Sequence, residues 1–319
     1  MKNSLLALIA LVLLNSCTPK SNVPVVGFAD AFEDNTIAQA KQGFMDALGN
    51  NGYSESKQNV KIVYRNAQGD IPKLTLSMKY FITQNVTLIA TCPSLSTITA
   101  VQNTKDIPVF MMVSPTPQLM KVTDAAGKAP ANLFGVGESL EYIDTSFALI
   151  PQLVKPKGAK LRVGILYNQS EPQSAEALSR IKGLADKLNV ELVSMSVSSS
   201  ADAMLVAKSL LTKDIDAFFA NPDNVVFSSF ETITKACKEA KVPIFTSEAG
   251  LVARGAVAAY GADLYQWGYQ SGEQAAAFLR NKSTKGLQWE MVKLRKRVYN
   301  PAMAKEYNIT IPENFEALK

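Results

Sequence analysis

The chain repeats one pattern of strands and loops, and this repeat constrains the fold more than any other feature. The segment Val26-Gly27-Phe28 recurs as Val163-Gly164-Ile165, each an apolar strand followed by a polar loop and an amphipathic helix. Further along, Ile107-Pro108-Val109-Phe110 recurs as Val242-Pro243-Ile244-Phe245. Two similar α/β units predict two similar lobes. A cleft between two lobes is a common place for a small molecule to bind.

The first residues have the pattern of an export signal. Lys2 precedes an apolar run over 5–14, and Ser16 precedes Cys17. The run is too short to span a bilayer well, so we predict a signal peptide over 1–16 and a polar tether over 17–22. The cysteine after a small residue resembles a bacterial lipoprotein signal, which implies lipidation of Cys17 and membrane attachment through that lipid. An ordinary signal peptide and an uncleaved anchor are the alternatives.

Composition excludes several classes of function. The chain has no histidine, which excludes histidine triads, histidine zinc sites and imidazole acid–base chemistry. It also has no G-x-S-x-G segment, P-loop or metal-ligand cluster. A net charge of +5 without a basic stripe does not favour nucleic-acid binding. We therefore expect no enzyme activity, no metal, no cofactor and no nucleic-acid partner.

Two cysteines remain if Cys17 carries lipid. We interpret Cys92 and Cys237 as separate, reduced and mostly buried thiols, because Cys237 falls on the apolar face of a predicted helix. A disulfide between them in an oxidising compartment is the alternative.

Strand and helix patterns alternate along the chain, which favours parallel sheets with helices on both faces. The predicted strands cover 23–28, 60–64, 86–90, 109–113, 162–167, 191–197, 217–220, 243–246 and 256–260. The predicted helices cover 35–48, 74–84, 94–103, 140–153, 171–188, 201–211 and 225–239, with a last long helix after Asp263. Ser170 and Gln173 fit a capping box at the start of one helix. The alternating tail over 290–298 predicts a single edge strand.

This order of elements resembles the type I periplasmic binding-protein fold, in which two Rossmann-like lobes are joined by a three-segment hinge. Segments such as Asn66-Ala67-Gln68-Gly69-Asp70 and Leu166-Tyr167-Asn168-Gln169-Ser170-Glu171 are similar to the tryptophan/tyrosine-type family of ABC transporter substrate-binding lipoproteins. The resemblance implies crossings between lobes near Gly137, Asp263 and Leu287. The lobes would then consist of 23–136 plus 264–287 and of 137–263 plus 288–319.

The same resemblance implies a function. It implies a monomeric lipoprotein of the bacterial cell envelope that captures a small solute between its lobes by hinge closure. The solute would be an amino acid, with aromatic ones favoured, and the partners would be an ABC permease and its ATPase. The alternative is a sensor that presents a solute to a membrane receptor, or a protein that binds a sugar or nucleoside.

Ligands of open α/β sheets bind beyond the carboxyl ends of the strands, and these ends identify the candidate residues. A helix start at Ser94 or after Ser170 suits a carboxylate, while Asp223, Glu248 or Asp263 suits an ammonium group. Aromatic residues at strand ends could bracket the side chain of a ligand. The predicted ligand-binding residues are Phe28, Asp30, Phe32, Thr91, Ser94, Ser114, Tyr167, Asn168, Ser170, Asn221, Asp223, Asn224, Glu248 and Asp263. The alternative is that Asp223, Asp263 and Ser170 only cap helices and that Phe28 belongs to the core.

Overall fold

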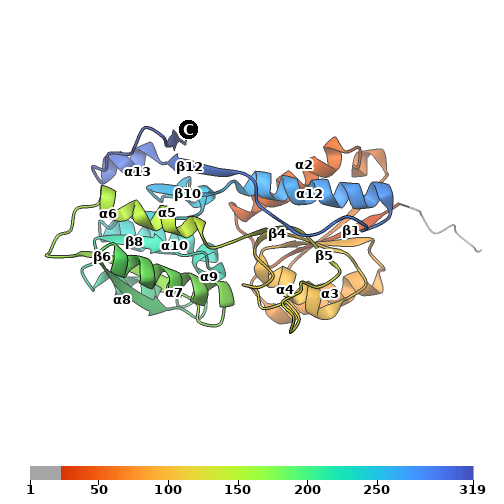
Figure 1. The fold of residues 1–319 in the computed structure, drawn as a ribbon, viewed down its shortest axis with the longest axis horizontal. Helices are drawn as coiled ribbons and strands as arrows, with labels where there is room; N and C mark the ends of the chain where they lie inside the picture. Colours follow the sequence, from red (N-terminus) through yellow and green to blue (C-terminus); the bar gives the residue numbers. More distant parts are fainter. Residues whose placement is uncertain (1–22, 319) are drawn as a thin grey trace, which may run out of the picture.

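A computed structural model describes residues 23–318, so the predicted signal peptide over 1–16, the tether over 17–22 and Cys17 lie outside the described residues. The described chain forms two α/β lobes that lie side by side along the long axis (Figure 1). One sheet has the strand order β11-β5-β4-β3-β1-β2 and the other β13-β12-β10-β9-β8-β6-β7. The predicted fold class, two Rossmann-like lobes, is confirmed.

The N-terminal lobe is built from a mostly continuous βα alternation. It contains β1 (Val25–Asp30), α2 (Ile37–Asn50), η2 (Glu55–Lys57), β2 (Lys61–Asn66), α3 (Ile71–Thr83), β3 (Leu88–Cys92), α4 (Ser94–Asn103), β4 (Val109–Pro115), β5 (Leu133–Glu138), α12 (Leu264–Asn281) and β11 (Glu290–Met291). Its paired strands are parallel, with Phe28 of β1 between Tyr64 of β2 and Ala90 of β3. Such a sheet needs helices on both faces, which explains the near-continuous apolar sequence of β1, β3 and β4.

The C-terminal lobe repeats this alternation. It contains α5 (Tyr142–Ala148), α6 (Ile150–Leu153), β6 (Leu161–Tyr167), α7 (Pro172–Lys187), β7 (Val190–Ser196), α8 (Ala203–Leu211), β8 (Ala217–Ala220), α9 (Asn224–Ser228), α10 (Phe230–Glu239), β9 (Ile244–Thr246), α11 (Ala249–Val252), β10 (Ala258–Ala262), β12 (Arg295–Tyr299), α13 (Pro301–Glu306) and β13 (Glu316–Ala317). Strand β12 runs antiparallel to β10, whereas the other paired strands of this sheet are parallel.

Three chain segments cross between the lobes, and one lies at a different place from the prediction. Strand β11 pairs with Val136 and Gly137 of β5 in the N-terminal sheet, so the third crossing follows Met291 rather than Leu287. The N-terminal lobe accordingly includes residues up to Glu138 and the segment 290–291. The single edge strand predicted over 290–298 is wrong, because β11 and β12 belong to different sheets. Alternation shows which face of a strand is buried but not which sheet it joins.

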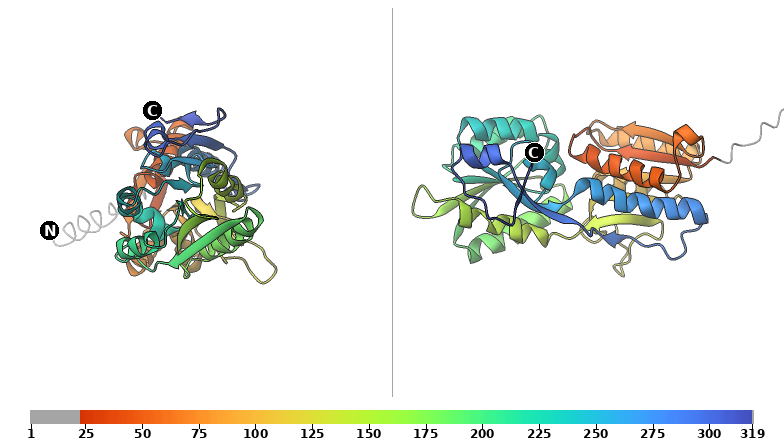
Figure 2. Two further views of the ribbon diagram at one scale, coloured as in Figure 1. Left: turned by 90° about the vertical axis from the view of Figure 1, so that its left-hand side faces the viewer. Right: turned by 90° about the horizontal axis from the view of Figure 1, so that it is seen from above.

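The helices α2 and α12 pack closely on one face of the N-terminal sheet, although they are far apart in the sequence (Figure 2). A β-carbon at Gly43 would lie 2.0 Å from the carbonyl oxygen of Tyr265, and one at Gly268 would lie 1.8 Å from that of Ala40. Only glycine permits this approach. Helix α12 is also held at the hinge, because Trp267 Nε1 donates a hydrogen bond of 2.8 Å to the carbonyl of Val136.

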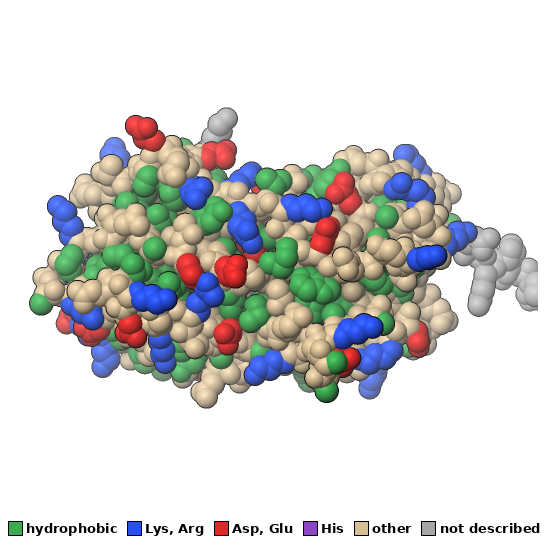
Figure 3. Space-filling model, in the orientation of Figure 1, with side chains coloured by type: hydrophobic (Ala, Val, Ile, Leu, Met, Phe, Trp, Pro, Cys, Tyr) green, Lys and Arg blue, Asp and Glu red, His purple; other side chains and the backbone are tan. Residues whose placement is uncertain are grey.

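Several local predictions were tested by the structure. Cys92 and Cys237 are free, buried thiols in different lobes, as interpreted. The capping box at Ser170 is wrong: α7 begins at Pro172 after Glu171, and the Ser170 amide donates to Asn168 Oδ1. Within residues 23–318, no helix combines the length and apolarity needed to cross a bilayer. On the face shown in Figure 3, acidic and basic side chains are interspersed.

Candidate functional site

A cavity lies between the lobes, where the carboxyl ends of strands from both sheets face each other. Its empty space is about 480 Å³, part of which is open to solvent. The N-terminal lobe, including α12 and the end of β5, contributes Ile37, Pro93, Ser94, Val113, Ser114, Pro115, Glu138 and Trp267. The C-terminal lobe and the first crossing contribute Leu140, Tyr142, Gln173, Pro222, Asp223, Asn224, Phe227 and Glu248. Among the described residues, no lysine or arginine lines this cavity.

Ser94 connects the two lobes at the start of α4. Its hydroxyl oxygen accepts hydrogen bonds from Asn224 Nδ2 at 3.0 Å and from Gln173 Nε2 at 3.3 Å, both in the C-terminal lobe. Because α4 has ten residues, its first turn presents amide donors and the positive end of a helix dipole. This corner of the cavity suits an anionic group.

A chain of hydroxyl groups holds Ser114 on the N-terminal side of the cavity. Thr97 Oγ1 lies 2.9 Å from Thr91 Oγ1 and 2.9 Å from Ser114 Oγ. Ser114 also donates to the Met112 carbonyl at 3.2 Å. Thr91 therefore supports the cavity from behind, while Ser114 faces it.

Glu248 presents a carboxyl group from the opposite lobe. Its Oε1 accepts a hydrogen bond of 2.7 Å from the Tyr142 hydroxyl, and its Oε2 has no partner among the described residues. Burial raises the pKa of Glu248 to about 8. Glu138 differs, because Arg295 Nε donates to its Oε2 at 3.1 Å and Arg295 Nη2 donates to Oε1.

A buried polar network orders the C-terminal side of the cavity. Glu171 Oε2 accepts from the amide of Asn224 at 3.0 Å, from Asn224 Nδ2 at 2.8 Å and from Gln173 Nε2 at 2.7 Å. Burial, and secondarily the charge of Asp223, raises the pKa of Glu171 to about 8. Asp223 accepts from the amides of Val225 and Val226 and caps α9. The network thus fixes the amide side chains of Asn224 and Gln173 that reach Ser94.

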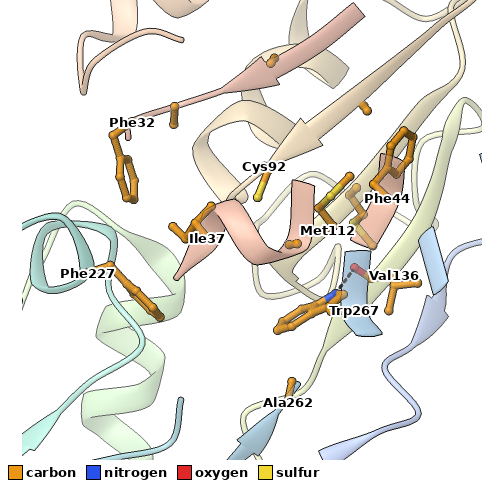
Figure 4. Close-up of a cluster of buried hydrophobic side chains, with 14 of the residues drawn as sticks. Phe32, Ile37, Phe44, Cys92, Met112, Val136, Phe227, Ala262 and Trp267 are labelled. Atoms are coloured by element: carbon orange, nitrogen blue, oxygen red, sulfur yellow. Dashed lines mark hydrogen bonds between the residues drawn. The ribbon is translucent and has the colours of Figure 1, made fainter. Parts of the chain in front are cut away.

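Large apolar side chains complete the cavity. Phe227 of α9 and the Trp267 indole of α12 point toward the same space from opposite sides, and Trp267 Nε1 donates a hydrogen bond to the Val136 carbonyl beside the hinge (Figure 4). Phe227, Ile37 and Trp267 are all nearly fully buried. Rings next to a few convergent polar groups are typical of a pocket for a small amphipathic molecule.

The structure divides the fourteen predicted site residues into three groups. Five line the cavity, namely Ser94, Ser114, Asp223, Asn224 and Glu248. Three lie behind the lining and bond to residues of the site region: Thr91 to Thr97, Asn168 to Glu171, and Asn221 to Ser174.

The other six residues do not line the cavity. Phe28 is in the core against Phe44 and Tyr64, and Tyr167 packs against the core of the C-terminal lobe. Phe32 is buried in the apolar cluster near Phe227 but is not part of the lining (Figure 4). Ser170 is exposed.

The two remaining acids have structural partners. Asp30 accepts from the Tyr64 hydroxyl at 2.8 Å, and burial raises its pKa to about 6. Asp263 caps α12 by accepting from the Gln266 amide at 3.1 Å and pairs with Lys296. The rule that ligands bind beyond the carboxyl ends of strands identifies the loops of the site. It does not show which side chains of those loops pack inside their own lobe instead of facing the cavity.

Some lining residues were not predicted. Glu138 and Tyr142 flank the first crossing, which the resemblance placed near Gly137. Gln173, Phe227 and Trp267 are on helices, where sequence periodicity marks them only as core or capping positions. Among the described residues, no group of three or more His, Cys, Asp or Glu side chains is arranged to hold a metal ion.

Comparison with known sequences gives two matches. A protein-family model described as ABC transporter substrate binding protein matches residues 25–318. The tyrosine-binding protein of Clostridioides difficile (strain R20291) is 32% identical over 269 residues, which cover 84% of this chain and 76% of that protein.

Comparison with solved structures shows the same fold. A conserved domain protein from Vibrio cholerae has a TM-score of 0.80 at 26% identity, with coverage of 93% of this chain and 100% of that one. The ABC domain in complex with L-Trp from Streptococcus pneumonia has a TM-score of 0.82 at 23% identity, covering 92% and 97%. The ligand-free, open structure of a substrate-binding protein with adhesive properties from Clostridium difficile has a TM-score of 0.67 at 26% identity, covering 93% and 99%.

Proposed function

Because the chain belongs to the family of ABC transporter substrate-binding proteins, we propose that it captures an aromatic amino acid, with L-tyrosine as the first candidate, in the cavity between its lobes. One observation carries this proposal: a helix start with hydroxyl groups, an unpaired carboxyl group and large apolar side chains line the same cavity. These are the three kinds of group that an aromatic amino acid needs. The name of the 32% identical relative supports the choice of tyrosine.

Each part of the ligand has a partner in this arrangement. The ligand carboxylate lies at the start of α4, near the hydroxyls of Ser94 and Ser114, because helix N-termini favour anions. The ammonium group lies against an acid of the C-terminal lobe, Asp223 or Glu248. The aromatic ring packs among Phe227, Trp267 and Ile37.

Capture is accompanied by closure of the hinge. The hydrogen bonds of Ser94 to Asn224 and Gln173 join the two lobes, so they break when the lobes separate. The higher TM-score to the L-Trp complex, 0.82, than to the open, ligand-free structure, 0.67, supports a closed arrangement of the lobes here. A ligand that contacts both lobes stabilises the closed state and shifts the equilibrium toward it.

The closed form is then presented to an ABC permease with its ATPase, and no covalent bond is made or broken in the ligand. Lipid on Cys17 would hold the protein, as a monomer, on a bacterial membrane, where it faces the periplasm or the exterior. Loss of membrane association in a Cys17→Ala variant, measured by fractionation, tests this part independently of binding.

A thermal-shift panel tests the ligand class. L-Tyrosine, L-tryptophan and L-phenylalanine are expected to raise the melting temperature, since a ligand at 100 times its Kd adds about 2.7 kcal/mol to stability. Leucine, tyramine and 3-(4-hydroxyphenyl)propionate serve as comparisons that lack the ring, the carboxylate or the amine. The protein is first unfolded and refolded to remove bound ligand. A shift with sugars alone, or with no amino acid, would contradict the proposal.

Ser94→Ala is expected to weaken tyrosine binding about tenfold, because it removes two hydrogen bonds between the lobes, each worth about 0.5–1.5 kcal/mol. Calorimetric titration measures the change. Ser96→Ala on the same helix is the matched control, because Ser96 Oγ donates to the Cys92 carbonyl within one lobe. The control should lower stability and leave the Kd unchanged. Equal losses of affinity in both variants would show that Ser94 does not act through closure.

A further inference from the structure

The cavity contains a carboxyl group without a cation. Glu248 is 3% exposed, and its Oε2 has no hydrogen-bond partner among the described residues. Asp223, the other candidate for an ammonium group, already uses both oxygens: Oδ1 accepts from the Val225 and Val226 amides, and Oδ2 accepts from the Asn168 amide at 2.6 Å. The free acceptor on the acidic side of the cavity is therefore Glu248 Oε2.

Strand β12, which pairs with β10 near Glu248, carries three cationic side chains, and each of them already has another partner. On β12, Arg295 pairs with Glu138 at the end of β5, and Lys296 pairs with Asp263. The Arg297 guanidinium lies 4.4 Å from the ring centroid of Tyr260 of β10.

The helices around Glu248 also lack a free cation among their described contacts. Arg254, just after α11, pairs with Asp34 and Glu231. From α5, Tyr142 donates its hydroxyl to Glu248, while Asp144 pairs with Arg180. The groups that act on the charge of Glu248 are Tyr142, which favours the ionised form, and Glu138, which opposes it.

Desolvation therefore decides the protonation state of Glu248 in the closed cavity before an amine enters it. A fully buried carboxyl without a cation favours the neutral acid, and the pKa of Glu248 at about 8 places the proton on it at pH 7. An ammonium ion supplies the missing cation and stabilises the carboxylate instead.

We propose that Glu248 binds the ligand's ammonium group and loses its proton as the ligand enters, so that capture of an amino acid releases one proton to solvent. In this step the neutral acid and the ammonium ion become a carboxylate–ammonium pair, and the proton leaves with water. The Tyr142 hydroxyl donates to Oε1 before and after. The inference rests on the proposed function, because it takes the ligand to be an amine.

The sign of the pH dependence follows from this step. In the closed, ligand-free state Glu248 holds a proton that the complex lacks, so protons compete with the ligand for this state. The association constant is expected to rise with pH, approaching tenfold per unit below about pH 8, and to level off above it.

Calorimetric titration with L-tyrosine, in buffers of different ionisation enthalpy at pH 7, counts the protons released. The wild-type protein is expected to release close to one. Glu248→Gln should release none and show a Kd that does not vary between pH 6 and 8. Asp30→Asn is the matched control, since Asp30 is another buried acid with a raised pKa, about 6, that does not line the cavity, and this variant should keep the release.

Two further readouts keep the proposal testable if Glu248→Gln does not fold. Tyr142→Phe retains the carboxyl but removes its donor, so the pH dependence should move to higher pH. The analogue 3-(4-hydroxyphenyl)propionate, which lacks the amine, should cause no release. Tyrosine binding without proton release in the wild-type protein would overturn this proposal and leave the proposed function intact. Absence of tyrosine binding would overturn both.

Discussion

Arg254→Met is expected to weaken tyrosine binding by about 2–4 kcal/mol, roughly 30- to 1,000-fold, with little change in the stability of either lobe. Arg254 of the C-terminal lobe pairs with Asp34 of the N-terminal lobe, and their side chains are only 12% and 1% exposed. Without the arginine, closure would bury the Asp34 carboxylate without a cation. In the open state the same carboxylate faces water, so the cost falls on closure and hence on affinity.

The contacts around this pair explain why we expect a large effect. Arg254 Nη1 also donates to Thr36 Oγ1 at 2.9 Å, while Asp34 Oδ1 accepts from the amides of Thr36 and Ile37 at the start of α2. Gly250 of α11 packs so closely on Thr36 that a β-carbon there would lie 2.0 Å from the threonine methyl. The pair is therefore held in a tight contact between the lobes.

Two control variants distinguish an effect on lobe closure from a general effect of removing an ion pair. Arg162→Met removes an exposed ion pair with Glu191 inside the C-terminal lobe and should leave the Kd unchanged. Asp34→Asn combined with Arg254→Met removes both charges while keeping the acceptor for the α2 amides, so it should recover part of the affinity. Calorimetry gives the Kd of each variant. Unchanged affinity in Arg254→Met would show that this pair does not stabilise closure.

Gly43→Ala is expected to destabilise the protein by about 1–3 kcal/mol, because the new methyl group would overlap the α12 backbone. A β-carbon at Gly43 would lie 2.0 Å from the Tyr265 carbonyl oxygen and 2.9 Å from the Tyr269 nitrogen. The two helices must then move apart, and α12 also carries Trp267 of the cavity. Urea unfolding measures the loss.

Gly49→Ala, on the same helix, is the matched control. A β-carbon at Gly49 meets nothing within 4 Å. Alanine there should stabilise the protein by about 0.5–1 kcal/mol, because it restricts the unfolded chain and favours the helix. Destabilisation of the same size at both positions would show that helix contact does not explain the role of Gly43.

The sequence predicts the lobes better than it predicts the site. The repeat of Val26-Gly27-Phe28 at Val163-Gly164-Ile165 identifies β1 and β6, each an interior strand next to an edge strand, because buried parallel strands are short apolar runs bounded by loops. The tail over 290–298 is harder, since its alternation fits an edge of either sheet. Its division into β11 and β12 depends on tertiary pairing with β5 and β10.

At the site, too, the sequence does not show which side chains tertiary packing brings to the cavity. Ser94 and Glu248 could be found because each follows a strand on the side where the lobes meet. Phe28 also stands near the end of a strand, so the sequence cannot distinguish it from the residues that line the cavity. In the structure its ring packs in the core against Phe44 and Tyr64. Trp267 has the pattern of a core residue on α12, and only the hinge geometry brings it to the cavity.

The most direct test of the central claim is a crystal structure of the protein with L-tyrosine. We predict one tyrosine between the lobes, with its carboxylate at the start of α4 near Ser94, its ammonium group on Glu248 and its ring among Phe227, Trp267 and Ile37. Tyrosine bound elsewhere on the molecule, or bound between the lobes with its ammonium group away from Glu248 and Asp223, would contradict the account.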